Sequence, residues 1–311
     1  MIEENIRVRL FTHTDLDGVG CAILAKMAFG ENVEISYCDY DKINQEVKEY
    51  ILKKEYHDMI HLTDISVNDT IAMDLNMIPN VTLLDHHPTA AYLNKYSWAK
   101  VDCRDKNERN MKTCGTEMYY HWLVNKGYLQ QNDFLISFVS IVRDWDTWRW
   151  VELGAKGTMS KNVNDLLGIY GRDRFIDKIF DKIFDDNTTF KLTRQEEELL
   201  DIKQDEVNRM IDRKSSEVMI FEKDGYQFGA VYCDKYISEI GNVLCYVFGQ
   251  LDFIALFDMN SGKVHLRAAK NDIDVGKIAA KYGGGGHPKS AAFVIREEYS
   301  RGVIQSIMGL G

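Results

Sequence analysis

The first hundred residues alternate between short apolar runs and longer segments with the spacing of helices. The predicted strands cover residues 6–11, 33–40, 58–65 and 81–87. Helices are predicted at residues 19–29 and 41–52, and a polar-apolar connection at residues 68–78. This alternation indicates βαβ units and a parallel sheet. Because crossovers in such units are right-handed, we expect the carboxyl ends of the strands at one edge of the sheet.

The pattern becomes helical after residue 110. The predicted helices cover residues 118–126, 134–142, 175–184 and 193–213. The last of these is dense in charged residues, which is typical of a solvated helix face. We expect it to connect two domains, since a chain of 311 residues exceeds the usual size of one.

Beyond residue 217 the predicted strands come in pairs. Asp224-Gly225 is a hairpin signal, and a second strand pair surrounds Asn260-Ser261-Gly262. We therefore predict an α/β protein with an N-terminal parallel sheet flanked by helices, a helical connector and a smaller C-terminal α/β domain with a mixed sheet. The predicted boundaries are residues 1–188, 189–216 and 217–311.

An acid and two histidines end the predicted strand at residues 81–87. Asp85, His86 and His87 are followed by Pro88, which stops a strand. A carboxylate with neutral imidazoles is a ligand set for Mn, Fe or Zn. The alternative is a polar surface turn, and the triplet alone does not decide between the two.

Further acids and a histidine follow the other predicted strands. Asp15 and Asp17, with His13 before them, lie between the first strand and the first helix. Asp64 lies near the end of the third strand. Ligands bind at the carboxyl ends of strands in open α/β sheets. Capping of the helix by Asp17 is the alternative, but a cap needs one acid only. We expect these side chains to converge with the Asp-His-His triplet.

Four consecutive glycines at residues 283–286 precede His287 and Lys289. Such a run exposes backbone N–H groups that bind anionic oxygens at close range. A flexible loop is the alternative. Arg267 and Lys270 on the preceding predicted strand favour an anion pocket.

Charge and composition exclude several classes of protein. The net charge of −10 leaves no overall basic field for long nucleic acid. The six cysteines form no Cys-x-x-Cys pair, so neither a zinc ribbon nor a thioredoxin-type site is indicated. The sequence shows no signal pattern and no apolar run of membrane-spanning length. We expect a cytoplasmic protein with no membrane partner.

The ordered motifs resemble those of the DHH phosphoesterase superfamily. The resemblance rests on Asp15-x-Asp17-Gly18, Asp64, Asp85-His86-His87 and Asp144. Asp144 follows the apolar helix at residues 134–142, where an acid is by itself usually a cap or a solvated end. The glycine run with His287 resembles the DHH-associated C-terminal domain. The chain looks most similar to the NrnB-type oligoribonucleases, or nanoRNases. RecJ-type exonucleases carry further domains, and family II pyrophosphatases have a different C-terminal domain.

The resemblance implies two divalent metal ions, with Mn preferred and Mg as the alternative. The residues that match the metal ligands are His13, Asp15, Asp17, Asp64, His86 and Asp144. Asp64 would bridge the two ions. Many members place the ligand histidine four residues before Asp15, where this chain has Phe11, so the contact of His13 with a metal stays open. The implied catalytic residues are Asp17, Asp64, Asp85, His86 and His87. The implied substrate-binding residues are His87, Arg267, Gly284, Gly285, Gly286 and His287.

The implied activity is hydrolysis of short single-stranded oligonucleotides or dinucleotides to 5′-mononucleotides, by a hydroxide that two metal ions activate. One alternative is a phosphatase or phosphodiesterase acting on nucleoside 3′,5′-bisphosphates or on linear or cyclic dinucleotides. An alternative of another class is a nucleotide-binding regulator without turnover. A third treats the acids as helix caps and predicts no metal uptake. Formation of a homodimer is a further possibility that the sequence leaves open.

Overall fold

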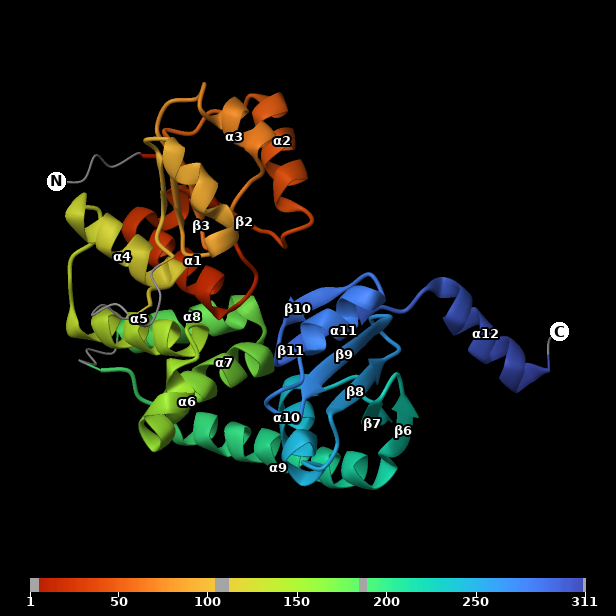
Figure 1. Cartoon of the computed structure of the whole chain (residues 1–311). Coiled ribbons are helices and arrows are strands. Elements are labelled where there is room, and N and C mark those ends of the chain that lie inside the picture. Colours follow the sequence, from red (N-terminus) through yellow and green to blue (C-terminus); the bar gives the residue numbers. More distant parts are fainter. Residues whose placement is uncertain (1–5, 104–111, 185–188, 310–311) are drawn as a thin grey trace. The chain divides into compact units, whose positions relative to one another are not determined.

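The computed structural model describes residues 6–103, 112–184 and 189–309, in two compact units (Figure 1). The units are Met1–Leu200 and Asp201–Gly311. Helix α9 (Arg194–Glu217) is continuous across this boundary. The predicted boundary at residue 188 lies outside the described residues, and the division into three parts stays a prediction. In the described part of the chain, no helix has both the length and the apolar character needed to span a bilayer.

The N-terminal unit contains a parallel sheet of five strands in the order β2-β1-β3-β4-β5. The strands are β1 (Val8–Thr12), β2 (Val33–Tyr37), β3 (Met59–Thr63), β4 (Val81–Asp85) and β5 (Ala99–Val101). This confirms the predicted α/β class and the parallel sheet. The order places β1 and β3 in the middle, so the segments that leave them lie between those that leave β2 and β4.

Helices cover both faces of this sheet and enclose two apolar cores. Side chains alternate along β1, so Val8 and Leu10 belong to one core and Phe11 to the other. The first core includes side chains of α1 (Leu16–Phe29), α4 (Gly115–Asn125), α5 (Asp133–Asp146), α7 (Thr158–Tyr170) and α8 (Arg172–Phe184). The second includes side chains of α2 (Ile43–Lys53) and α3 (Asp69–Leu75). Short segments complete the unit at Gly30–Asn32, Pro88–Lys95, Arg149–Leu153 and Gly154–Gly157.

The structure contains helices that the sequence pattern did not predict. Helix α3 lies within the predicted connection at residues 68–78, and the side chain of Asn68 caps it by accepting from the backbone N–H of Ile71 (3.0 Å). Helix α7 was also not predicted. Helix α5 ends at Asp146, four residues later than expected. This last difference changes the site.

The C-terminal unit is built on a mixed sheet of six strands in the order β10-β11-β9-β8-β7-β6. The strands are β6 (Met219–Lys223), β7 (Tyr226–Tyr232), β8 (Phe253–Asp258), β9 (Lys263–Ala268), β10 (Gly285–His287) and β11 (Ser290–Val294). Only β7 and β8 pair in parallel among these described strands. The predicted hairpin is confirmed, since Asp224 and Gly225 join β6 to β7 with φ of 55° and 79°, as a type I′ turn requires.

Each face of the C-terminal sheet has its own core. Ile254 and Leu256 point to the face that packs against α10 (Ile237–Val247). Phe253 and Ala255 point to the face that packs against α11 (Val275–Lys281). A final helix, α12, covers Glu297–Met308. The alternation along β8 therefore separates two environments.

Candidate metal centre

Three neighbouring strands of the N-terminal sheet end in register at the candidate site. Thr12 of β1 pairs with Thr63 of β3, which pairs with Leu84 of β4. The next residues along these strands are His13, Asp64 and Asp85. The expected convergence of the strand ends follows from this register.

One group of possible ligands consists of His13, Asp15 and Asp64. His13 Nδ1 lies 2.9 Å from Asp15 Oδ2 and 3.9 Å from Asp64 Oδ2. His13 is largely buried, so its ring faces the carboxylates rather than solvent. The spacing of two residues between His13 and Asp15 therefore still brings the imidazole to the site.

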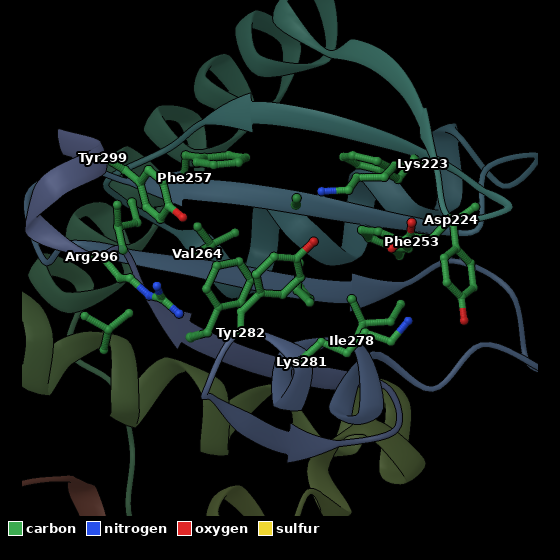
Figure 2. Close-up of a pocket in the computed structure, with 17 residues that line it drawn as sticks. Lys223, Asp224, Phe253, Phe257, Val264, Ile278, Lys281, Tyr282, Arg296 and Tyr299 are labelled. Carbon is green, nitrogen blue, oxygen red and sulfur yellow. The ribbon is translucent and has the colours of Figure 1, made fainter. Parts of the chain in front are cut away.

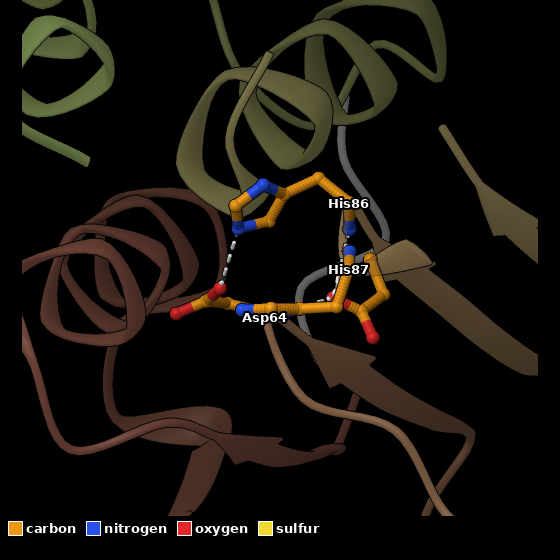
Figure 3. Close-up of side chains that lie close together, drawn as sticks. Asp64, His86 and His87 are labelled. Carbon is orange, nitrogen blue, oxygen red and sulfur yellow. Dashed lines mark hydrogen bonds and ion pairs between the residues drawn. The ribbon is translucent and has the colours of Figure 1, made fainter. Parts of the chain in front are cut away.

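A second group consists of Asp17, His86 and Asp146. His86 Nε2 lies 3.7 Å from Asp17 Oδ2 and 3.4 Å from Asp146 Oδ2. The same nitrogen lies 3.2 Å from Asp64 Oδ1. A dashed line marks this contact in Figure 3. Asp64 therefore adjoins both groups, with Oδ1 toward the second and Oδ2 toward the first.

Asp146, rather than the predicted Asp144, is the acid that α5 brings to the cluster. Asp144 Oδ1 instead accepts hydrogen bonds from Arg143 Nη2 and Arg149 Nη1, both at 3.1 Å. Side chains two residues apart on a helix point in directions about 200° apart, so Asp144 and Asp146 face opposite ways. The structure does not bring Asp144 into the cluster, and we propose Asp146 in its place.

The periodicity of α5 contains the signal for Asp146. The buried side of the helix includes Leu135, Val139 and Val142. Asp146 follows Val142 by four residues and so lies on the same side of the helix. Ending the predicted helix at residue 142 concealed this repeat.

The amino end of α4 holds Asp17 in place. Asp17 Oδ2 accepts from the backbone N–H of Gly115 (2.6 Å), and Oδ1 accepts from that of Thr116 (2.8 Å). The hydroxyl of Thr116 donates to the backbone carbonyl of Asp17 (2.6 Å). A carboxylate is stabilised at a helix N-terminus because the first N–H groups point at it. The sequence pattern did not indicate this contact.

Asp64 has a strained backbone that Gly115 accommodates. Its φ of 57° lies in the left-handed region, which aspartate and asparagine tolerate better than most residues. A Cβ on Gly115 would lie 2.5 Å from Asp64 Cβ and 2.9 Å from Asp64 Cα. Only glycine therefore allows α4 to approach Asp64 so closely.

Asp85 stabilises the turn after β4, and it also forms a third group of possible ligands with Asp64, His86 and His87. Its Oδ1 accepts from the backbone N–H of His86 (2.7 Å) and lies 2.7 Å from His87 Nδ1. Its Oδ2 accepts from the hydroxyl of Ser66. On the other side of the ring, His87 Nε2 forms a hydrogen bond with the hydroxyl of Tyr40 (3.0 Å). Asp85 thus fixes which nitrogen of His87 is directed outward.

The carboxylates of the cluster perturb one another. Burial raises the pKa of Asp64 well above its usual range, and the negative charges of Asp17 and Asp15 raise it further. Burial, followed by the same two charges, raises the pKa of Asp146 to about 8. Burial by itself would lower the pKa of His87, but the hydrogen bond to Asp85 and its charge outweigh this and raise it. The cluster is therefore short of positive charge.

The substrate-binding residues predicted in the C-terminal unit lie on adjacent strands. Ser290 of β11 pairs with His287 on one side and with Arg267 on the other. Arg267 donates to Ser238 Oγ (3.3 Å) and to the carbonyl of Leu266 (3.1 Å). Gly284 and Gly286 are needed for packing, since a Cβ there would lie 2.1 Å from the Ala292 carbonyl oxygen and 2.5 Å from Ala291 Cα. Gly285 has open space where a Cβ would be.

Comparison with known proteins decides the family. Residues 234–307 match the DHHA1 domain. The chain is 36% identical over 296 residues to oligoribonuclease NrnB of Bacillus subtilis. The aligned region covers 93% of this chain and 73% of that protein. The chain belongs to the DHH phosphoesterase superfamily.

Solved structures share the fold of this DHH protein. A DHH domain from a member of the s1p family of ribosomal proteins has a TM-score of 0.61 at 12% identity, over 97% of this chain and 86% of that one. RecJ of Thermus thermophilus in complex with Mn²⁺ has a TM-score of 0.55 at 13% identity, over 97% of this chain and 51% of that one. At these identities the likeness concerns the fold alone.

The cluster formed by His13, Asp15, Asp17, Asp64, His86 and Asp146, called the DHH cluster below, fits divalent cations. Asp64 Oδ2 and Asp146 Oδ2 are buried and have no hydrogen-bond partner among the described residues. Carboxylate oxygens with an imidazole beside them are suitable ligands for Mn or Mg. A cation would also offset the clustered negative charge that raises the pKa values of Asp64 and Asp146.

Replacement of Gly115 by alanine should damage this DHH site. The added methyl group would force α4 away from Asp64, and we expect the protein to lose about 1–3 kcal/mol of stability and about 10-fold or more of any metal-dependent turnover. Thermal unfolding and turnover with Mn²⁺ measure the two effects. Gly168→Ala is the control, because its added Cβ meets nothing within 4 Å on helix α7. Unchanged activity of Gly115→Ala would show that the close approach is not needed.

Proposed function

We propose that this protein is a metal-dependent phosphodiesterase that hydrolyses short oligonucleotides, of the nanoRNA class, to 5′-mononucleotides. The observation that carries the proposal is the position of Asp64, which forms one ligand group with His13 and Asp15. Its Oδ1 lies 3.2 Å from Nε2 of His86, which belongs to the second group. The relative from Bacillus subtilis, named an oligoribonuclease, supports the substrate class. We also propose that turnover requires Mn, with Mg as the alternative, because the donor set mixes carboxylates with histidine.

The residues divide naturally between two ions. His13, Asp15 and Asp64 would hold one ion, and Asp17, Asp64, His86 and Asp146 the other. When bound, such ions would polarise a phosphoryl oxygen and lower the pKa of bound water, so that hydroxide would be available to attack phosphorus near neutral pH. The backbone N–H groups of Gly115 and Thr116 keep Asp17 oriented for this role.

His87 is the residue we propose for contact with the scissile phosphate. Asp85 occupies Nδ1, so Nε2 is the nitrogen available to an outside group. Tyr40 hydrogen-bonds to Nε2, and a phosphate oxygen can take the place of its hydroxyl. The raised pKa of His87 favours the protonated ring, which donates from Nε2 to an anionic oxygen. Asp85 acts through His87 and through the turn that also carries His86.

Arg267 and His287 are the residues we propose for binding a second phosphate of the substrate. Arg267 has no carboxylate within 4.0 Å in the described residues, so its charge is available to a ligand. The open space beside Gly285 allows a phosphate to approach the backbone. A net charge of −10 offers no extended track for a long strand, so we expect a few local charges to select short substrates.

A substrate panel tests the proposed activity. Purified protein with Mn²⁺ is incubated with dinucleotides, oligonucleotides up to about ten residues, a long single strand, a cyclic dinucleotide, pyrophosphate and a nucleoside 3′,5′-bisphosphate. We expect 5′-mononucleotides from the short oligonucleotides and the slowest turnover of the long strand. Preferred turnover of the bisphosphate or the cyclic dinucleotide would replace the proposed substrate. Nucleotide binding without any hydrolysis would indicate a regulator.

Arg267→Ala tests the second phosphate contact. We expect KM for a dinucleotide to rise about 10- to 100-fold, because a charge-assisted hydrogen bond to phosphate is lost. Steady-state kinetics with Mn²⁺ give KM and kcat separately. Lys263→Ala is the control, since it removes a positive charge from an exposed position on the same strand. Equal effects of the two substitutions would mean that Arg267 contributes only to the general field.

A further inference from the structure

The C-terminal sheet has a cavity on the face that packs against α11. Its volume is about 500 Å³, within the range of small-molecule sites. Figure 2 shows side chains from β8, β9 and α11 around it, among them Phe253, Val264 and Ile278. Seven of the 17 lining residues are aromatic, which favours a flat, unsaturated ligand over an aliphatic one.

Two stacked pairs of rings give the cavity flat apolar surfaces. Phe228 and Phe253 lie 4.8 Å apart at an interplanar angle of 5°. Tyr282 and Phe293 lie 4.7 Å apart at 19°. A planar heterocycle can continue either stack, because aromatic rings favour offset parallel contact. Tyr282 is half-exposed, so its stack is accessible from solvent.

Positive charge borders these rings. Lys223 Nζ lies 6.0 Å from the centre of the Tyr282 ring, and Lys281 Nζ lies 6.0 Å from that of Tyr226. Neither lysine has an acidic partner within 4.0 Å in the described residues. Arg296 also lines the cavity, but its Nη1 lies 3.6 Å from Glu298 Oε1. Asp224 is the one acid among the 17 lining residues. The ligand that this combination suits is an aromatic ring that carries negative charge.

The cavity and Arg267 lie on opposite faces of the sheet. Along β9, Val264 and Leu266 line the cavity. Arg267 points the other way, because a Cβ on Gly241 of α10 would lie 2.9 Å from Arg267 Cγ. A ligand in the cavity therefore does not contact the guanidinium proposed to bind substrate.

We propose that this cavity is a separate nucleotide site that takes a purine mononucleotide. The base continues an aromatic stack beside Tyr282, and the phosphate binds Lys223 and Lys281. The proposal is independent of the activity of the DHH cluster, since none of the cluster residues lines the cavity.

Calorimetric titration of the full chain with adenosine monophosphate, in EDTA to suppress binding through metals, tests the proposal. We expect a dissociation constant below about 1 mM for the wild type. Replacing both Lys223 and Lys281 by alanine should weaken binding about 10-fold or more and leave adenosine unaffected. Tyr282→Leu should weaken the binding of both ligands. Lys277→Ala, at an exposed position on α11, is the matched control and should have no effect.

Further titrations distinguish this cavity from the substrate site proposed at Arg267. Arg267→Ala should bind adenosine monophosphate as tightly as the wild type. Loss of binding in that variant would place the nucleotide at the proposed substrate site and overturn the proposal. No binding by the wild type at millimolar nucleotide, unchanged affinity in the double lysine variant, or equal affinity for inorganic phosphate would also overturn it.

Discussion

Asp64→Asn is expected to lose about 10³-fold or more of any Mn-dependent turnover, because it removes the carboxylate that belongs to the first ligand group and also lies beside His86 of the second. Asparagine has the same shape and tolerates the left-handed backbone at this position. The fold should therefore survive the change. Elemental analysis should show that the variant retains less metal per chain than the wild type.

The same variant should be more stable than the wild type when metal is removed. Burial and the charges of Asp17 and Asp15 raise the pKa of Asp64 in the folded chain. An acid whose folded pKa exceeds its unfolded value costs stability as the pH rises above that unfolded value, about 4. Asparagine removes this cost. We expect a gain of about 1–3 kcal/mol near neutral pH that shrinks toward pH 4.

Thermal unfolding in EDTA at two pH values measures this gain, and turnover with Mn²⁺ measures the loss of activity. Asp74→Asn is the control, because its carboxylate is exposed on α3. Turnover of Asp64→Asn within tenfold of the wild type would contradict the shared-ligand arrangement. A metal-free variant less stable than the wild type would contradict the electrostatic argument.

Asp146→Asn and Asp144→Asn should have opposite consequences. Asp146→Asn should lower turnover about 10²- to 10³-fold, because Asp146 Oδ2 faces His86 at 3.4 Å. Asp144→Asn should keep most of the activity and lose about 1–2 kcal/mol of stability, because Arg143 and Arg149 lose a charged partner. Steady-state turnover and thermal unfolding of both variants make the comparison.

Comparing these two variants tests whether the acid that the structure places in the cluster, Asp146, or the acid that matches the family motif, Asp144, acts at the site. The two changes are chemically identical and two residues apart on one helix. A severe loss of turnover in Asp144→Asn with a mild loss in Asp146→Asn would mean that α5 is rotated in the working enzyme. A similar mild loss in both would remove α5 from the metal centre.

The site residues that follow the strands of the N-terminal sheet could be predicted, because their placement depends on local sequence. His13, Asp64 and Asp85 each follow a short apolar run, and parallel pairing alone brings such positions together. The same reasoning located Asp17 at the start of α1. The predicted fold class was confirmed for the same reason, since strand and helix periods are properties of neighbouring residues.

The residues that escaped prediction depend on tertiary contacts or on an element's end. Gly115 and Thr116 hold Asp17 across almost a hundred residues, and no local pattern encodes that contact. Asp146 was missed because the apolar run stops at Val142, although the helix continues. Tyr40 contacts His87 from the turn that follows β2, so its role depends on sheet order.

The bonds from Gly115 and Thr116 to Asp17 also determine when the metal centre can exist. The possible ligands extend from His13 to Asp146, and Asp17 is oriented only once the start of α4 has docked. During synthesis the ribosome must release most of the N-terminal unit before these groups meet. We therefore expect any metal ions that bind here to stabilise the N-terminal unit only after its two cores have formed.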